Sequence, residues 1–232
     1  MLLFFRGTTI FLLNRFANLA NRNKLIIIMK KGFIFFVLLV ACGFLLSFIN
    51  TNAGAELGLN APLPMADEKM KDVSGKEVSL NTTKTAKGLL VIFSCNTCPY
   101  VKLSESRIKE LSDDCAKQGI GCIIINSNEA QRADEDSFDA MVKYAAAQKL
   151  TCAYVVDTNS KLADAFGATR TPQCFLFNTK GLIYKGAIDD NVKDPAAAKA
   201  HYLKDAIDAL AKNETPKMQE TKSIGCTIKR VE

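Results

Sequence analysis

Histidine is almost missing from this sequence of 232 residues, in which His201 is the only one. The cysteines are also too scattered for a structural zinc site, because Cys95 and Cys98 form the one close pair and the others stand singly. A four-ligand zinc site needs a second close pair of Cys or His residues. Structural zinc is therefore disfavoured, and we predict neither a metal nor a cofactor.

Acidic residues are absent from positions 1–55, although that segment carries six basic ones. The whole chain has 30 Lys and Arg residues against 24 Asp and Glu, which gives a formal net charge of +6. Removing the six leading basic residues leaves 24 of each sign, so the rest of the protein is net neutral. A basic surface for nucleic acid is therefore not expected, and the excess charge belongs to a leader.

The leader has the layout of a secretory signal peptide between Met29 and Ala55. Two lysines follow Met29, an apolar stretch covers 33–48, and small residues end the segment. Two alternatives remain, a retained membrane anchor and lipid attachment at Cys42. In each case we expect residues 1–55 to be a leader or anchor. We also expect that translation of the protein begins at Met29. The rest of the chain is then exported to the periplasm or another extracytoplasmic compartment, where disulfides persist.

Residues 56–212 are expected to form one domain, followed by a C-terminal tail at 213–232. Apolar runs alternate there with segments of helical periodicity. Strands are expected at 71–73, 78–80, 88–93, 122–126, 154–157, 173–178 and 182–188, and helices at 101–119, 138–145, 161–166 and 196–211. The run at 88–93 is apolar throughout, which is typical of a central strand buried on both faces. This order predicts an α/β fold with a central mixed β-sheet flanked by helices.

The segment FSCNTCPYVK at 93–102 places the cysteine pair where that central strand passes into a helix. Backbone N–H groups and the positive end of the helix dipole meet there, so we expect Cys95 to be a thiolate nucleophile. Cys98, one turn further on, would resolve the mixed disulfide. A Cys95–Cys98 ring is too small to add much stability. Reversible thiol–disulfide exchange is therefore favoured over a static staple.

Five motifs occur in order along the expected exported part: FSCNTCPYV at 93–101, INSNE at 125–129, ATRTPQCFLFN at 168–178, YKGAIDDN at 184–191 and SIGCTIK at 223–229. Together they resemble the bacterial thioredoxin-like family of the alkyl hydroperoxide reductase and thiol-specific antioxidant superfamily. The resemblance implies a thioredoxin fold in which Thr171 and Pro172 form a substrate-facing cis-proline loop beside the cysteine pair. It also implies protein or small-molecule disulfides as substrates and an upstream thiol reductant.

The sequence departs from two groups of relatives at the cysteine pair. Peroxiredoxins carry Thr or Ser three residues before the reactive cysteine and Pro four residues before that, where this chain has Ile92 and Gly88. A thiol peroxidase that acts on peroxides with the same cysteines is therefore kept as the alternative enzyme. Ordinary thioredoxins have Trp before the pair and Gly-Pro within it, whereas this chain has Ser94 and 96–97 reads Asn-Thr. The direction of electron flow stays open, because reduction potential depends on such neighbours.

Cys226 lies in the tail, thirteen residues beyond Asn213. An extended segment of that length spans roughly 45 Å, against a radius of gyration of about 16 Å for the domain, so the tail can reach the cysteine pair. Cys226 is either an auxiliary resolving thiol or a small packed side chain. A copper-binding chaperone, the alternative outside enzymes, would need a third ligand, and His201 is expected in solvent. Asp189 and Asp190 are expected to cap a turn.

Four further cysteines fall within or beside apolar runs and are expected to pack as buried side chains. These are Cys115, Cys122, Cys152 and Cys174.

Overall fold

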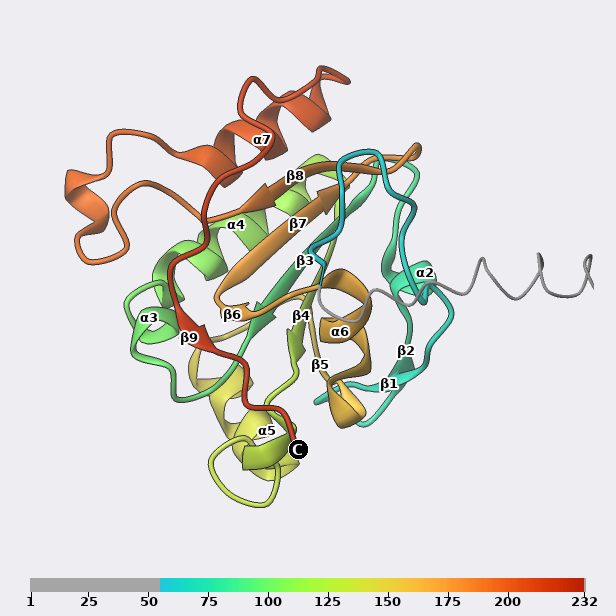
Figure 1. Ribbon diagram of the computed structural model, residues 1–232, viewed down its shortest axis with the longest axis vertical. Coiled ribbons are helices and arrows are strands. Elements are labelled where there is room, and N and C mark those ends of the chain that lie inside the picture. Colours follow the sequence, from blue (N-terminus) through green and yellow to red (C-terminus); the bar gives the residue numbers. More distant parts are fainter. Residues whose placement is uncertain (1–54, 232) are drawn as a thin grey trace, which may run out of the picture. The chain divides into compact units, whose positions relative to one another are not determined.

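A five-stranded mixed sheet forms the centre of the computed structural model, which describes residues 55–231 (Figure 1). Its strands lie in the order β5, β4, β3, β7, β8. β3, β4 and β5 run parallel, and β7 runs antiparallel to both β3 and β8. The bounds are β3 Leu89–Ser94, β4 Gly121–Asn126, β5 Ala153–Val156, β7 Gln173–Phe177 and β8 Leu182–Gly186. The predicted α/β fold with a mixed sheet is confirmed.

Helices cover both faces of the sheet. Alternate side chains of β3 point to opposite faces, as in any strand, so Leu90 and Ile92 join one hydrophobic cluster while Val91 and Phe93 join the other. The first cluster contains side chains of α4 (Glu105–Gln118), α5 (Phe138–Ala147) and α7 (Tyr202–Ala211). The second contains side chains of α2 (Leu80–Thr83) and α6 (Lys161–Phe166). β3 is thus buried on both faces, as its unbroken apolar run predicts.

The remaining elements are short. They are β1 Met70–Lys71, β2 Glu77–Val78, α3 Pro99–Lys102, η1 Glu129–Gln131, η2 Thr158–Ser160, β6 Arg170–Thr171, η3 Pro195–Ala197 and β9 Cys226–Thr227.

The single helix expected after the cysteine pair is divided into α3 and α4. At Ser104 the backbone departs from ideal helical angles, with φ −108° and ψ −1°. The Ser104 hydroxyl donates to the carbonyl of Tyr100 at 2.8 Å, an alternative to regular helix bonding. Leu103, which the periodicity included in the apolar face, is 45% exposed. The break therefore separates a short turn that follows the cysteines from the long helix that packs on the sheet.

The last helix begins at Tyr202 rather than at Ala196, where the sequence predicted it. Residues 196–200 form only a 3-10 turn and an irregular segment, and none of them is buried. The buried side chains of α7 start at Leu203 and continue through Leu210. Because most helical stability in proteins comes from packing an apolar face, the alanine-rich segment has helix propensity but nothing to pack against.

The tail packs along the domain instead of extending away from it. Figure 1 shows it passing from α7 by β8 toward β6. Lys185 of β8 exchanges backbone hydrogen bonds with Gln219 and Thr221, at 2.9 and 3.0 Å. Further on, β9 pairs antiparallel with β6, and Ile228 is buried. The tail thus contributes a strand and a core side chain to the domain.

The predicted signal peptide or anchor lies outside the described residues. Among residues 55–231, no helix combines the length and apolar character that crossing a bilayer requires.

Candidate active site

Both cysteines of the pair lie at the carboxyl end of β3. Cys95 follows the last residue of the strand and is 1% exposed. Cys98 is the residue that precedes α3, and Pro99 occupies the first helical position, where its missing N–H costs no hydrogen bond. A fully buried central strand therefore positions the pair, since β3 is bonded on both sides by β4 and β7.

The Thr171–Pro172 peptide bond is cis, as the resemblance implies. Thr171 contacts both cysteines. Its hydroxyl oxygen lies 3.5 Å from the sulfur of Cys95, and its carbonyl oxygen lies 3.2 Å from the sulfur of Cys98. The structure thus brings together four of the five residues predicted for the site, from two segments more than seventy residues apart in the sequence.

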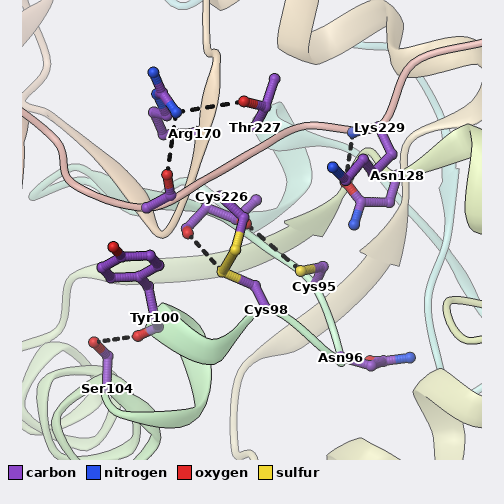
Figure 2. The surroundings of a disulfide bond; sticks show 12 residues. Cys95, Asn96, Cys98, Tyr100, Ser104, Asn128, Arg170, Cys226, Thr227 and Lys229 are labelled. Atoms are coloured by element: carbon purple, nitrogen blue, oxygen red, sulfur yellow. Dashed lines mark hydrogen bonds between the residues drawn. A yellow bond between two sulfur atoms is a disulfide. The ribbon is translucent and has the colours of Figure 1, made fainter.

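The fifth residue, Cys226, forms a disulfide with Cys98 (Figure 2). The two residues are 128 positions apart in sequence, and their Cα atoms are 6.0 Å apart. Cys95 remains a free thiol. This pairing differs from the small Cys95–Cys98 ring expected from the sequence, because the tail brings a third thiol within bonding distance of Cys98.

Backbone and side-chain bonds hold the tail at this position. β9 pairs with β6 so that Cys226 lies opposite Thr171. Arg170 donates to the carbonyl of Gly225 and to the hydroxyl of Thr227, each at 3.3 Å, and Figure 2 shows this bridge above the disulfide. A side chain at position 225 would collide with the Thr171 carbonyl, so glycine permits the close approach.

Burial raises the pKa of the Cys95 thiol above its usual value. The Thr171 hydroxyl opposes this shift, the negative charge of Asp136 adds to it, and the backbone N–H groups of Cys98 and Thr97 lower it. The expectation that the strand–helix junction favours the thiolate is therefore wrong for this state of the protein. Desolvation by burial outweighs the donors, and α3 is only four residues long.

A buried carboxylate supports the cysteine loop. Asp136 is fully buried and accepts three hydrogen bonds, from the backbone N–H of Asn96 and the side-chain amides of Asn126 and Asn128, at 2.8, 2.8 and 2.9 Å. The Tyr154 hydroxyl donates to the side chain of Asn96 at 2.9 Å. These bonds fix the residue that follows Cys95, so Asp136 acts on both the position and the charge environment of the thiol.

Sequence reasoning missed Asp136. It lies in EAQRADEDS at 129–137, where several acids stand together and nothing distinguishes the buried one. Two of its three asparagine partners, Asn126 and Asn128, belong to the quoted motif INSNE, so the motif indicated the right segment but not what it binds.

A cavity of about 140 Å³ opens beside the disulfide. Cys95, Cys98 and Asn128 line it together with Cys226 and Lys229 of the tail. His201 lines a different cavity, with Arg107 and Lys204. Within residues 55–231 no three His, Cys, Asp or Glu side chains are arranged to hold a metal ion. The site therefore offers thiols, a hydroxyl and amides.

Two further predicted residues have structural roles. Asp190 accepts the backbone N–H of Lys199 at 2.9 Å, and Asp189 accepts that of Asn191 at 3.0 Å, so both cap turns as expected. Asp189 also forms a buried ion pair with Arg107 of α4, which the sequence did not indicate.

A mixed sheet with a cysteine pair at the end of its central strand and a facing cis-proline defines a thioredoxin-like protein. A family model described as Redoxin matches residues 59–202. The chain therefore belongs to the redoxin family, whose members are redox enzymes, and the predicted resemblance is confirmed.

Solved structures agree with this assignment. A hypothetical protein from Sinorhizobium meliloti 1021 is 31% identical, with a TM-score of 0.67 over 76% of this chain and 97% of its own. An uncharacterized conserved protein from Geobacillus kaustophilus is 27% identical, with a TM-score of 0.67 over 78% of this chain and 94% of its own. A thioredoxin-like protein in the oxidized form is similar in fold, at 19% identity, with a TM-score of 0.54 over 68% and 99% of the two chains. No curated protein matches the chain.

Proposed function

We propose that this protein is an exported thiol–disulfide oxidoreductase that uses Cys95, Cys98 and Cys226 in sequence. The observation that carries the proposal is the Cys98–Cys226 disulfide beside a free Cys95. A nucleophile that is free while its neighbour holds the disulfide is what a completed cycle leaves behind. The substrates are protein or small-molecule disulfides, and a thiol reductant resets the enzyme.

The cycle consists of three exchanges. In the reduced protein, the Cys95 thiolate attacks a substrate disulfide, which forms a mixed disulfide and releases one substrate thiol. Cys98 then attacks the Cys95 sulfur and releases the second substrate thiol. Finally Cys226 attacks the Cys98 sulfur, which frees Cys95 and leaves the Cys98–Cys226 disulfide. Each step makes one S–S bond and breaks one. Two electrons pass from the enzyme to the substrate, and an external dithiol returns them.

Timed thiol trapping tests this order. Fully reduced protein is mixed with a small disulfide, quenched with an alkylating agent at intervals and digested with trypsin. Cys95 and Cys98 share the peptide 88–102, and Cys226 lies in 223–229, so the two disulfides are distinguished by mass. We expect the disulfide within 88–102 to appear first and the cross-linked pair to replace it. In Cys226→Ser the first disulfide should accumulate and persist.

The matched control is Ile224→Ser, in the same tail, because the side chain of Ile224 is 53% exposed. It should leave the order unchanged. If the cross-linked pair forms in wild-type protein without the earlier disulfide, Cys98 attacks the substrate directly and the proposed order is wrong.

A thiol peroxidase is the second candidate, and one contact favours it. Ile92 provides no hydroxyl at the position where peroxiredoxins have one, but the Thr171 hydroxyl lies 3.5 Å from the Cys95 sulfur. That group could orient a peroxide, whose reduction by Cys95 would give a sulfenic acid for Cys98 to resolve. Comparing the rates of the reduced protein with hydrogen peroxide and with a small disulfide separates the two candidates. The oxidoreductase proposal requires the disulfide to react faster. A copper chaperone has no comparable support, since His201 lines a separate cavity.

Export rests on the leader at 1–55, whose composition fits a signal peptide or a membrane anchor. A disulfide between distant residues suits such a compartment, because cytosolic thiols are kept reduced. Fusing residues 1–60 to a reporter phosphatase that is active only outside the cytoplasm should give activity, and deleting 33–48 should abolish it. Fractionation of the fusion tells cleavage from retention in the membrane. An inactive full fusion would contradict export.

A further inference from the structure

Three of the cysteines that the catalytic cycle does not use converge at the other end of the sheet. Cys122 is the second residue of β4, and Cys152 directly precedes β5. In the parallel pairing of these strands Ile123 lies opposite Ala153, so Cys122 and Cys152 are neighbours one position earlier. Cys115 reaches the same place from α4, and its thiol is one of the groups that raise the pKa of Cys122.

The sulfurs of Cys122 and Cys152 both contact the hydroxyl of Ser112, and each lies 3.6 Å from the Ser112 oxygen. Ser112 donates its only hydroxyl proton to the carbonyl of Ile108, at 2.7 Å. Its lone pairs therefore remain to accept from the two thiols, which converge on one atom. Each of the two thiols also shifts the pKa of the other, which agrees with their closeness.

We propose that Cys122 and Cys152 form a second, redox-convertible dithiol, which a small-molecule disulfide oxidises to a Cys122–Cys152 disulfide. Neighbouring residues of adjacent strands have their Cα atoms about 5 Å apart, within the range that a disulfide bridges. The oxidation consumes one small-molecule disulfide, makes one S–S bond in the protein and releases two small thiols. Cys152 is the half-buried member and offers the entry point for the oxidant, whereas Cys122 and Cys115 are buried.

This dithiol is remote from the catalytic cysteines. Cys122 lies opposite Leu90 in the pairing of β3 with β4, and Cys95 is five residues after Leu90, just beyond the end of β3. That offset corresponds to about 16 Å along the strand. The proposal is therefore independent of the catalytic cycle, and its failure would not affect that cycle.

The new dithiol should react slowly. Hydrogen bonding within the cluster and burial raise the pKa of both Cys122 and Cys152. Because only the thiolate attacks a disulfide, the oxidation rate should rise about tenfold per pH unit between about pH 7 and pH 9. The Cys98–Cys226 disulfide should form well before the Cys122–Cys152 disulfide at neutral pH.

Trypsin separates the three thiols of the cluster, since Cys115 lies in peptide 110–117, Cys122 in 118–132 and Cys152 in 150–161. Reduced full-length protein is incubated with glutathione disulfide over this pH range. Remaining thiols are alkylated, first under native and then under denaturing conditions, and the digest is analysed by mass spectrometry without reduction. We expect a linked pair of peptides 118–132 and 150–161, which Cys152→Ala removes and Cys115→Ser retains.

Two results would overturn the proposal. One is the recovery of 118–132 and 150–161 as alkylated single peptides even at the highest pH, after the Cys98–Cys226 disulfide has formed completely. The other is a link between 110–117 and 118–132 in wild-type protein, which would assign the reactive pair to Cys115 and Cys122.

Discussion

Replacing Cys95 with serine should reduce turnover of a disulfide substrate on the order of 10³-fold or more, because the cycle loses its nucleophile. Serine is close to cysteine in size and can keep the contact with the Thr171 hydroxyl, so the buried site should remain folded. Turnover is measured with a small disulfide and an excess of reductant. Circular dichroism and thermal unfolding of Cys95→Ser verify that the loss is chemical.

The variant also distinguishes the roles of the three cysteines. In Cys95→Ser the Cys98–Cys226 disulfide should still form during slow oxidation, because the tail contacts do not involve residue 95. Cys152→Ser is the matched control, since Cys152 is remote from the site, and it should keep wild-type turnover. Turnover of Cys95→Ser within about tenfold of wild type would assign the attack to Cys98 or Cys226.

The parts of the fold that the sequence predicted are those decided by local pattern. An unbroken apolar run such as 88–93 fits a strand buried on both faces, whatever its neighbours are. The helix at 161–166 ends where expected because Gly167 adopts the left-handed conformation that closes it. The helix predicted at 196–200 is absent for the opposite reason. The helix propensity of this segment is local, but it has no apolar surface to pack against.

The parts of the site that could not be predicted depend on contacts between distant segments. Chain length shows that Cys226 can reach the pair, but not which sulfur it meets. The pairing of β9 with β6, and the close fit of Gly225 against Thr171, bring Cys226 to the sulfur of Cys98. The same holds for the Cys95 pKa. A strand–helix junction suggests a thiolate, whereas burial of Cys95 in the folded domain reverses the shift of its pKa.

Replacing Asp136 with asparagine should lower the pKa of Cys95, because the carboxylate charge is one of the causes that raise it. Removing that charge leaves burial as the main cause and favours the thiolate. Alkylation of Cys95 should therefore be faster than in wild type at any pH below the thiol's pKa, and its pH profile should move to lower pH. The rate is followed by mass spectrometry of peptide 88–102 in the oxidised protein, where Cys98 is blocked by its disulfide.

A purely structural role for Asp136 predicts a different result. Asp136 accepts three N–H donors on its two oxygens, and an amide in its place cannot accept on both sides. Stability should fall by about 1–3 kcal/mol from the unsatisfied donor, which urea unfolding measures. As long as Cys95 stays as buried as in wild type, loss of these bonds alone would not move the midpoint of the pH profile to lower pH. Asp134→Asn, an exposed acid of the same loop, is the control and should change neither quantity. An unchanged midpoint in Asp136→Asn would limit Asp136 to holding Asn96 in place.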